Sequence, residues 1–213
     1  MDFLDEKLTA YVEAHTDKEN NLLEKLNRET WAKIIMPRML SGHLQGRVLA
    51  MFSKMIKPER ILEIGTYTGY SALCLAEGLT SSGKLFTIDI NEELTGMVNR
   101  YIAESPYKNQ VNVLTGDATQ IIGDIDEQFD LVFIDADKEN YSNYFDLVIE
   151  KVKSGGFIIT DNVLWSGNIL KNKNDMDEET RAIDNYNNKI HQDDRVENVL
   201  FPIRDGLMVA RKK

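Results

Sequence analysis

The chain has 213 residues, enough for one α/β domain with its own core, and 42% of them are hydrophobic, which excludes a disordered chain. Its net charge of -10 disfavours long nucleic acid as a partner, because no broad basic field is available. No apolar run approaches the ~20 residues that span a bilayer, and the acidic, amphipathic first residues do not read as a signal peptide. With a single cysteine, Cys74, the chain forms no internal disulfide, and we expect a cytoplasmic protein.

The first predicted elements are helices. Apolar residues recur at helical spacing over residues 3–34 and again over 44–56, with Pro37 and a short link at 38–42 between them.

The rest of the chain alternates between strands and helices. Strands are expected at 61–65, 85–88, 111–114, 130–134 and 156–160, and helices at 70–79, 92–104, 118–122, 141–152 and 177–190. Two last strands, 196–203 and 207–211, are joined by the turn Arg204-Asp205-Gly206. This alternation predicts one α/β domain over residues 1–213 with a doubly wound, mostly parallel sheet, to which the hairpin adds an antiparallel strand.

The stretch RILEIGTYTGYS, residues 60–71, predicts a strand, a tight turn from Gly65 to Gly69 and the start of a helix. Such a unit turns backbone N–H groups and a helix N-terminus towards a nucleotide-like ligand. The spacing G-x-x-x-G lacks the second glycine of dinucleotide sites, and the acidic Glu63 would repel a phosphate. A positively charged ligand without phosphate fits better, and S-adenosylmethionine (AdoMet) is one. The alternative is a turn that serves α/β packing alone.

Four predicted strands deliver an aspartate to the edge where open α/β sheets bind ligands: Asp89, Asp117, Asp135 and Asp161. Asp89 follows Gly65 at a spacing suited to accept the ribose hydroxyl hydrogens. Asp117 is placed to accept from an adenine amino group, with the Ala118 N–H directed at a ring nitrogen. For Asp89 and Asp117, a helix cap or turn is the alternative role.

Asp135, Asp161 and Asn162 form a second set. Two carboxylates and an amide oxygen, without His or Cys, favour Mg²⁺, Mn²⁺ or Ca²⁺ over zinc. Lys138 follows Asp135 by three residues. Beside a divalent cation its charged form would be disfavoured by like charge, and it could act as general base for a hydroxyl. The alternatives are a plain turn at Asp161-Asn162 and an ordinary surface lysine at Lys138.

Four segments together resemble a known family: LEIGTYTGYS (62–71), TIDIN (87–91), FIDADKENY (133–141) and TDNVLWSGN (160–168). They closely resemble the cation-dependent O-methyltransferases, the caffeoyl-CoA and catechol group of class I AdoMet-dependent enzymes. The resemblance implies a Rossmann-like sheet of seven strands with the last strand antiparallel. It also implies methyl transfer from AdoMet to a hydroxyl of a small, catechol-like acceptor, with Mg²⁺ or another divalent cation bound.

The resemblance also implies roles for single residues. AdoMet would contact Met39, Ser41, Glu63, Gly65, Thr66, Ser71, Asp89, Asp117, Ala118 and Asp135. The cation would bind Asp135, Asp161 and Asn162, and Lys138 and Asp135 would be catalytic, with Lys138 as the base. Members of this group are commonly homodimers. The helical N-terminal part, residues 1–56, and the loop at 165–176 would shape the acceptor pocket. Both match the group poorly, which leaves the acceptor open. Trp165 and Tyr144 would either wall an aromatic ring or belong to the core.

Two other functions stay open at this point. Some bacterial relatives resemble methylases of a hydroxylated uridine in tRNA. The acidic balance weighs against tRNA, although basic residues such as Arg38, Lys171 and Lys173 would allow contacts with it. The other alternative is a module that binds a nucleoside ligand without catalysis, against which the complete Asp135, Lys138, Asp161 and Asn162 set argues.

Overall fold

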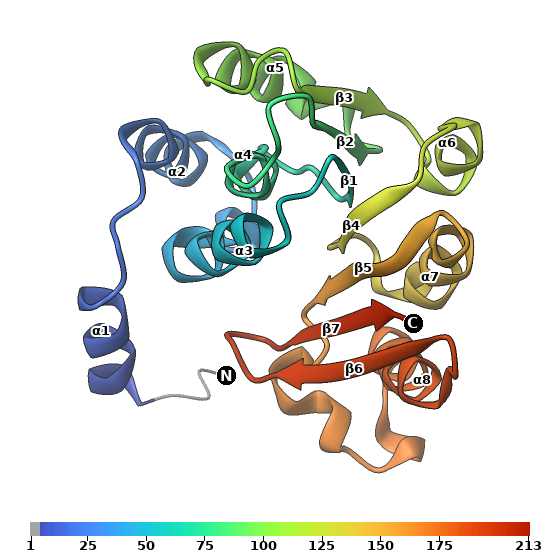
Figure 1. Cartoon of the computed structure of the whole chain (residues 1–213). Coiled ribbons are helices and arrows are strands. Elements are labelled where there is room, and N and C mark those ends of the chain that lie inside the picture. Colours follow the sequence, from blue (N-terminus) through green and yellow to red (C-terminus); the bar gives the residue numbers. More distant parts are fainter. Residues whose placement is uncertain (1–4) are drawn as a thin grey trace. The chain divides into compact units, whose positions relative to one another are not determined.

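The computed structural model describes residues 5–213, which form two compact units (Figure 1). We call Glu6–Ala118 the first unit and Thr119–Lys213, with which Asp5 is grouped, the second unit. Among the residues described, no helix has both the length and the apolar character needed to cross a membrane.

The first unit begins with the helices α1 (Glu6–Ala14), α2 (Asn21–Lys33) and α3 (Gly42–Ile56), with the 3-10 turn η1 (Pro37–Met39) before α3. The predicted helices are confirmed, although residues 3 and 4 lie outside the described part. α2 starts where it does because the Asn20 side chain accepts a hydrogen bond from the Leu23 N–H at 3.0 Å, which caps the helix. Pro37 stands first in η1 after Met36 at φ 62°, a left-handed backbone that separates α2 from α3.

Three parallel strands follow in the spatial order β3-β2-β1: β1 (Arg60–Ile64), β2 (Lys84–Asp89) and β3 (Val111–Thr115). Between them lie α4 (Tyr70–Ala76), the turn η2 (Glu92–Leu94) and α5 (Thr95–Glu104). The Gly65 N–H donates to Ile88 O at 2.9 Å and the Gly116 N–H to Asp89 O at 2.8 Å. The carboxyl ends of these three strands therefore lie level with one another.

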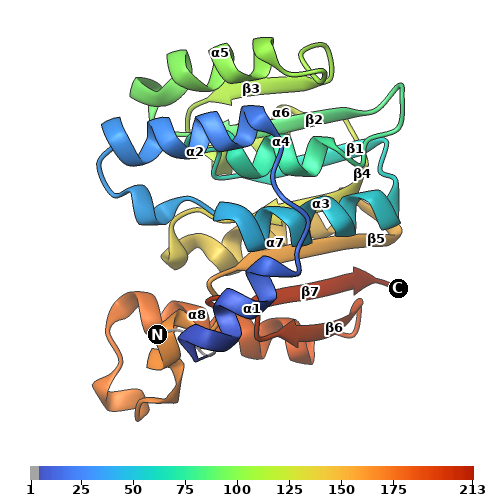
Figure 2. The same cartoon turned by 90° about the vertical axis from the view of Figure 1, so that its left-hand side faces the viewer.

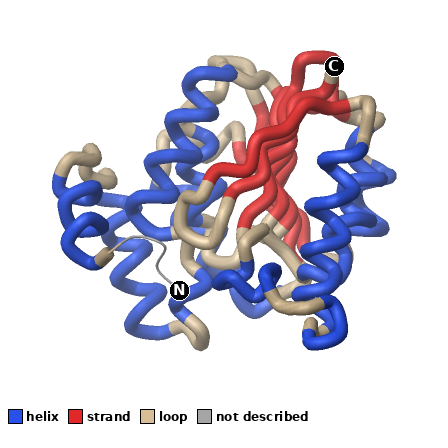
Figure 3. Tube along the Cα trace, turned by 90° about the horizontal axis from the view of Figure 1, so that it is seen from below, coloured by secondary structure: helices blue, strands red, loops and turns tan. Residues whose placement is uncertain are grey.

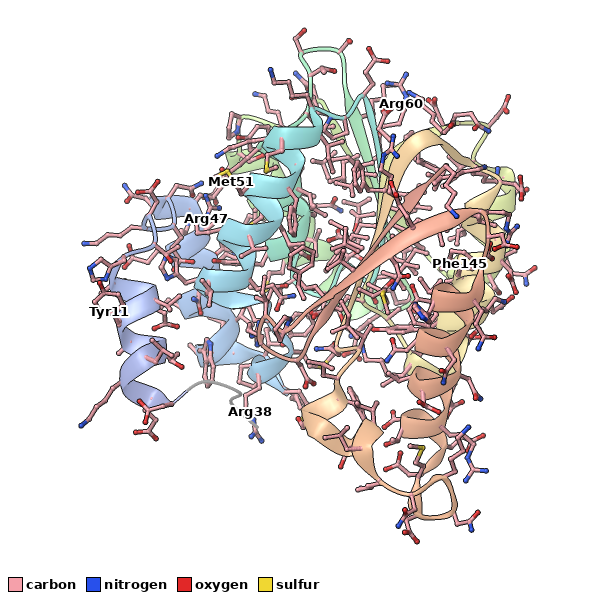
Figure 4. All side chains as sticks on the ribbon, turned by 60° about the horizontal axis from the view of Figure 1, so that its bottom comes forward. Tyr11, Arg38, Arg47, Met51, Arg60 and Phe145 are labelled. Atoms are coloured by element: carbon pink, nitrogen blue, oxygen red, sulfur yellow. The ribbon has the colours of Figure 1, made fainter. Side chains whose placement is uncertain are left out.

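α3 and α4 run side by side, and α4 also contacts β2 (Figure 2). Arg47, labelled on α3 in Figure 4, forms a 2.6 Å ion pair with Glu77 at the end of α4. α4 ends at Ala76 and not at the predicted residue 79. The next turn brings Gly78 against the Ser53 backbone, where a Cβ atom would come within 2.1 Å.

The second unit has four strands in the order β4-β5-β7-β6: β4 (Phe129–Ile134), β5 (Val152–Asp161), β6 (Val196–Phe201) and β7 (Leu207–Lys212). β4 and β5 are parallel, whereas β7 is antiparallel to both of its neighbours. β7 carries the C-terminus (Figure 3). The antiparallel last strand predicted from the sequence is therefore confirmed. Ile134 pairs with Thr160, so Asp135 follows β4 beside the place where Asp161 ends β5.

The helices of this unit are α6 (Ala118–Asp124, starting at the last residue of the first unit), α7 (Tyr141–Ile149) and α8 (Glu178–Gln192). Three 3-10 turns complete it: η3 (Lys138–Asn140), η4 (Trp165–Leu170) and η5 (Lys173–Asp175). α7 and α8 bury large aromatic side chains, namely Tyr141, Phe145 and Tyr186. This core anchors the segments that carry the predicted site residues of the unit.

Candidate active site

The glycine turn of the first unit has a backbone that few residues adopt. Gly65 and Gly69 have φ values of 102° and 87°, and Tyr67 between them has φ 48°. The Gly69 N–H donates to Thr66 O at 2.8 Å and closes the turn before α4 begins. A left-handed backbone conformation at a tyrosine carries a conformational cost, so further contacts must hold Tyr67 in place.

Asp89 supplies that contact. Its Oδ2 accepts the Tyr67 N–H at 2.6 Å, and its Oδ1 accepts the Asn91 N–H at 2.8 Å. A carboxylate offers about four lone-pair sites, so these two bonds leave acceptor capacity for the hydroxyl groups of a ligand. Asp89 thus lies beside the glycine turn as the sequence predicts, and its ribose role stays a prediction.

Glu63 is fully buried and ends a chain of hydrogen bonds. The Thr87 hydroxyl donates to Glu63 Oε2 at 2.5 Å, and Thr66 Oγ1 lies 2.5 Å from Thr87 Oγ1. A hydroxyl has one hydrogen, and Thr87 gives its hydrogen to the carboxylate. The Thr66 hydroxyl must therefore donate to Thr87, which leaves Thr66 to act towards any other group as an acceptor. The sequence analysis assigned no role to Thr87, although this residue begins the segment TIDIN.

The other predicted cofactor residues also belong to the first unit. Ser71 lies in the first turn of α4 and is nearly buried, whereas Asp117 is exposed just after β3, before the buried Ala118. Met39 ends η1 with 59% of its surface exposed, and Ser41 precedes α3. The structure places these residues in one unit, and their contacts with a cofactor remain predicted.

In the second unit, Lys138 contacts two of the three predicted cation ligands, Asp135 and Asn162. Its Nζ lies 3.1 Å from Asp135 Oδ1, 2.9 Å from Asn162 Oδ1 and 2.5 Å from the Tyr141 hydroxyl. An ammonium group has three hydrogens, and these three acceptors use all of them. Lys138 is only 9% exposed, so the alternative of an ordinary surface lysine is wrong.

Tyr141 was missed by the sequence analysis. Its hydroxyl donates to Asp161 O at 2.9 Å while it accepts from Lys138. Complete burial raises the pKa of Tyr141 well above its usual value, and the nearby carboxylates of Asp135 and Asp161 raise it further. The Tyr141 hydroxyl therefore stays protonated, and it orients Lys138 by a hydrogen bond without forming an ion pair with it.

The predicted donor set has the chemistry that an oxygen-preferring divalent cation requires, and its binding of a cation stays a prediction. The Lys138 ammonium already bridges a carboxylate oxygen of Asp135 and the amide oxygen of Asn162, so this set accepts positive charge. In residues 5–213, no group of three or more His, Cys, Asp or Glu side chains is arranged to hold a metal. The predicted set is of another kind, two carboxylates with one amide, which suits Mg²⁺.

Comparison with known proteins shows the family to which the chain belongs. A family described as O-methyltransferase matches residues 13–213, which span both units. The chain belongs to the O-methyltransferase family. It is 31% identical to caffeoyl-CoA O-methyltransferase of Medicago sativa over 92% of this chain and 83% of the relative. It is 33% identical to caffeoyl-CoA O-methyltransferase 1 of Eucalyptus globulus, over 87% of this chain and 79% of the relative.

Solved structures confirm the fold of this O-methyltransferase. The O-methyltransferase from Bacillus cereus in complex with SAH superposes with a TM-score of 0.89 at 29% identity, over 97% of both chains. The O-methyltransferase TomG from Streptomyces achromogenes in complex with SAM gives 0.88 at 24% identity, over 97% of this chain and 96% of that one. The predicted fold class, a Rossmann-like, mostly parallel arrangement of seven strands with an antiparallel last strand, is therefore confirmed.

Two aromatic residues of the O-methyltransferase were predicted either to wall an acceptor ring or to belong to the core. The Trp165 ring centroid lies 5.7 Å from Lys138 Nζ, close enough for a cation–π contact. Tyr144 is 4% exposed and donates to Asp137 Oδ1 at 2.5 Å. Trp165 thus lies at the predicted cation set, whereas Tyr144 belongs to the core.

Proposed function

We propose that this O-methyltransferase uses AdoMet and a divalent cation to methylate a hydroxyl of a small, catechol-like acceptor. The observation that carries the proposal is the position of Lys138, buried between Asp135 and Asn162. The relatives named for caffeoyl-CoA support a small acceptor, and the neighbours solved with SAM or SAH support the cofactor.

AdoMet supplies the methyl group, and residues of the first unit would bind it. The glycine turn at Gly65 would receive the cofactor, Asp89 the ribose, and Asp117 with Ala118 the adenine. The remaining contacts would come from Met39, Ser41, Glu63, Thr66 and Ser71, and from Asp135 of the second unit. Thr66 suits a cationic ligand because its hydroxyl hydrogen is committed to Thr87.

Asp135, Asp161 and Asn162 would hold the cation, which when bound lowers the pKa of an acceptor hydroxyl and orients it. In its neutral amine form, Lys138 would take the hydroxyl proton as general base, with Tyr141 holding its Nζ in place. The acceptor oxygen forms a bond to the methyl carbon as the bond from carbon to sulfur breaks, and S-adenosylhomocysteine leaves. Orienting two reactants in this way supplies up to about 7–11 kcal/mol in model reactions.

The test is methyl transfer from labelled AdoMet to catechols, hydroxycinnamoyl thioesters and undermethylated tRNA, with Mg²⁺ or with EDTA. We expect a methylated small acceptor and released S-adenosylhomocysteine in the reactions with Mg²⁺ and neither product in those with EDTA. Full turnover by metal-free protein would refute the cation role. AdoMet binding without turnover on any acceptor would instead favour a non-catalytic module, and methylation of tRNA alone would exclude the small acceptor.

Asp161→Ala is the variant for this test. It should lose cation binding and turnover but keep its fold, because relief of carboxylate repulsion partly offsets the lost ligand. Asp146→Ala is the matched control, because Asp146 pairs with Lys189 at 2.6 Å on the exposed side of α7 and has no predicted role. Equal activity of the two variants would remove Asp161 from the cation set.

We further propose a single catalytic domain that acts in the cytoplasm as a homodimer. The dimer follows from the resemblance stated above, and one family match across both units supports the single domain. Light scattering of the purified protein measures the dimer directly, and a monomer at micromolar concentration would contradict it.

A further inference from the structure

The turn Arg204–Gly206, which joins β6 to β7, holds the segment 162–166. The Leu164 N–H donates to Asp205 O at 2.8 Å, and the Val163 N–H to Gly206 O at 3.2 Å. The Asp205 side chain adds a third bond, in which Oδ1 accepts the Ser166 N–H at 2.5 Å. Residues far apart in sequence are thus joined mainly through backbone groups.

The segment that this turn holds has an unusual backbone. Asn162, Trp165 and Ser166 have φ values of 59°, 45° and 53°, in the left-handed region that L-residues rarely adopt. Such conformations persist only where surrounding contacts over-determine them, and they concentrate at functional sites. The Asp205 carboxylate binds the N–H of Ser166, one of these residues.

Gly206 allows the close approach. It has φ 91°, and a Cβ atom there would lie 2.5 Å from Leu164 Cγ and 3.0 Å from the Leu164 backbone nitrogen. Any other residue would push the segment away from the turn. The sequence Asp205-Gly206 is therefore matched to this contact as well as to the hairpin.

The held segment carries two side chains directed at Lys138. Asn162 Oδ1 accepts from Lys138 Nζ at 2.9 Å, and the Trp165 ring centroid lies 5.7 Å from the same nitrogen. We propose that Asp205 is a positioning residue, which through Ser166 fixes Trp165 and Asn162 at Lys138 and so determines cation affinity and acceptor binding. This inference rests on the proposed function, because the cation and the acceptor enter through it.

The experiment uses the two tryptophans of the chain. In a Trp31→Phe background, Trp165 is the sole tryptophan and reports on the segment by its fluorescence and its quenching by acrylamide. Asp205→Ala removes the side-chain bond but keeps the two backbone bonds, so the hairpin should still form. Asp205→Asn keeps an acceptor oxygen in place. Mn²⁺ titration, acceptor KM and AdoMet calorimetry are measured on each variant.

We expect Asp205→Ala to expose Trp165 to acrylamide and to weaken Mn²⁺ binding about 10-fold, the lower end for residues that orient metal ligands. Acceptor KM should rise more than kcat falls, with AdoMet affinity unchanged. Asp205→Asn should behave as the parent. Unchanged Trp165 quenching in the alanine variant, or an asparagine variant as impaired as alanine, would overturn the proposal.

A pair of glycine variants separates positioning from general strain. Gly155→Ala places an alanine at φ 84° in the first half of β5, away from Asp161. Its Cβ would approach only the end of the Arg211 side chain, at 3.4 Å. Gly206→Ala should expose Trp165 and weaken Mn²⁺ binding, whereas Gly155→Ala should not. Equal effects would overturn the proposal. If the parent binds no Mn²⁺, the proposed function fails, and Trp165 quenching alone still decides the role of Asp205.

Discussion

Replacing Lys138 by methionine is expected to tighten divalent-cation binding while it slows methyl transfer. The Lys138 ammonium donates to Asp135 Oδ1 at 3.1 Å and to Asn162 Oδ1 at 2.9 Å, and both residues are predicted cation ligands. A cation that takes these oxygens must displace the lysine from them. In the methionine variant the stem remains, but the competing charge is gone.

The size of the effect follows from the bonds displaced. A hydrogen bond that involves a charged group contributes about 1.5–3 kcal/mol net, and Lys138 gives up two of them. Because the released ammonium is rehydrated and keeps its contact with Tyr141, we take the value of one bond. That corresponds to a cation affinity roughly 10–100-fold tighter. The lost base should lower kcat by a factor of ~10²–10⁴.

Calorimetric titration of the metal-free protein with Mg²⁺ or Mn²⁺ measures the first effect, and initial rates at saturating cation measure the second. Lys153→Met is the matched control, because Lys153 also pairs with an aspartate, Asp130, at 2.7 Å in the same unit. Unchanged or weaker cation binding in Lys138→Met would refute the competition. A kcat equal to that of the parent at every pH would end the catalytic role.

Three further predictions concern the first unit. Thr87→Val should weaken AdoMet by about 1–3 kcal/mol, because the buried Glu63 loses the Thr87 donor, and Thr87→Ser should restore the affinity measured by calorimetry. Asp89→Ala should cost about 1.5–3 kcal/mol of AdoMet affinity, since it also releases the Tyr67 N–H; unchanged binding would exclude the ribose role. Burial, partly offset by Arg47, raises the pKa of Cys74 to about 12. The thiol should therefore react with a disulfide reagent only on unfolding. The protonated thiol should contribute fully to the free energy of unfolding below pH 9.0, its usual pKa, and this contribution should fall as the pH rises towards 12, as denaturant titrations would show.

The sequence predicted the order of helices and strands well, because turn residues and changes of apolar period mark most boundaries. It failed where tertiary contacts set the boundary. β5 was expected to start at Gly156 but begins at Val152, since the pairing with β4 shifts register between Phe129 and Leu131 and takes in Gly155 at φ 84°. A glycine pair reads as a turn in sequence, whereas here it lies within an irregular strand.

The candidate site shows the same limit. The aspartates at strand ends were predictable because parallel strands bring their carboxyl ends to one edge of a sheet. The bond from Thr87 to Glu63 spans 24 residues and that from Ser166 to Asp205 spans 39, so neither leaves a local signal. Tyr141 is only three residues from Lys138, yet its contact depends on how η3 passes into α7.

The division of the residues between two units makes the two binding functions separable by experiment. Asp89 and the glycine turn belong to Glu6–Ala118, whereas Asp161 and Asn162 belong to Thr119–Lys213. If the proposed roles hold, AdoMet should bind in EDTA, and Asp161→Ala should remove the cation without changing AdoMet affinity. Asp135 is the one residue proposed to contact both AdoMet and the cation. Asp135→Ala should therefore be the one single variant that weakens the binding of both. Because residues that share no partner contribute additively, Asp89→Ala combined with Asp161→Ala should lose AdoMet affinity by the amount that Asp89→Ala loses alone. A larger loss in the double variant would mean that the cation supports the cofactor, and the separate assignment of the two residue sets would then be wrong.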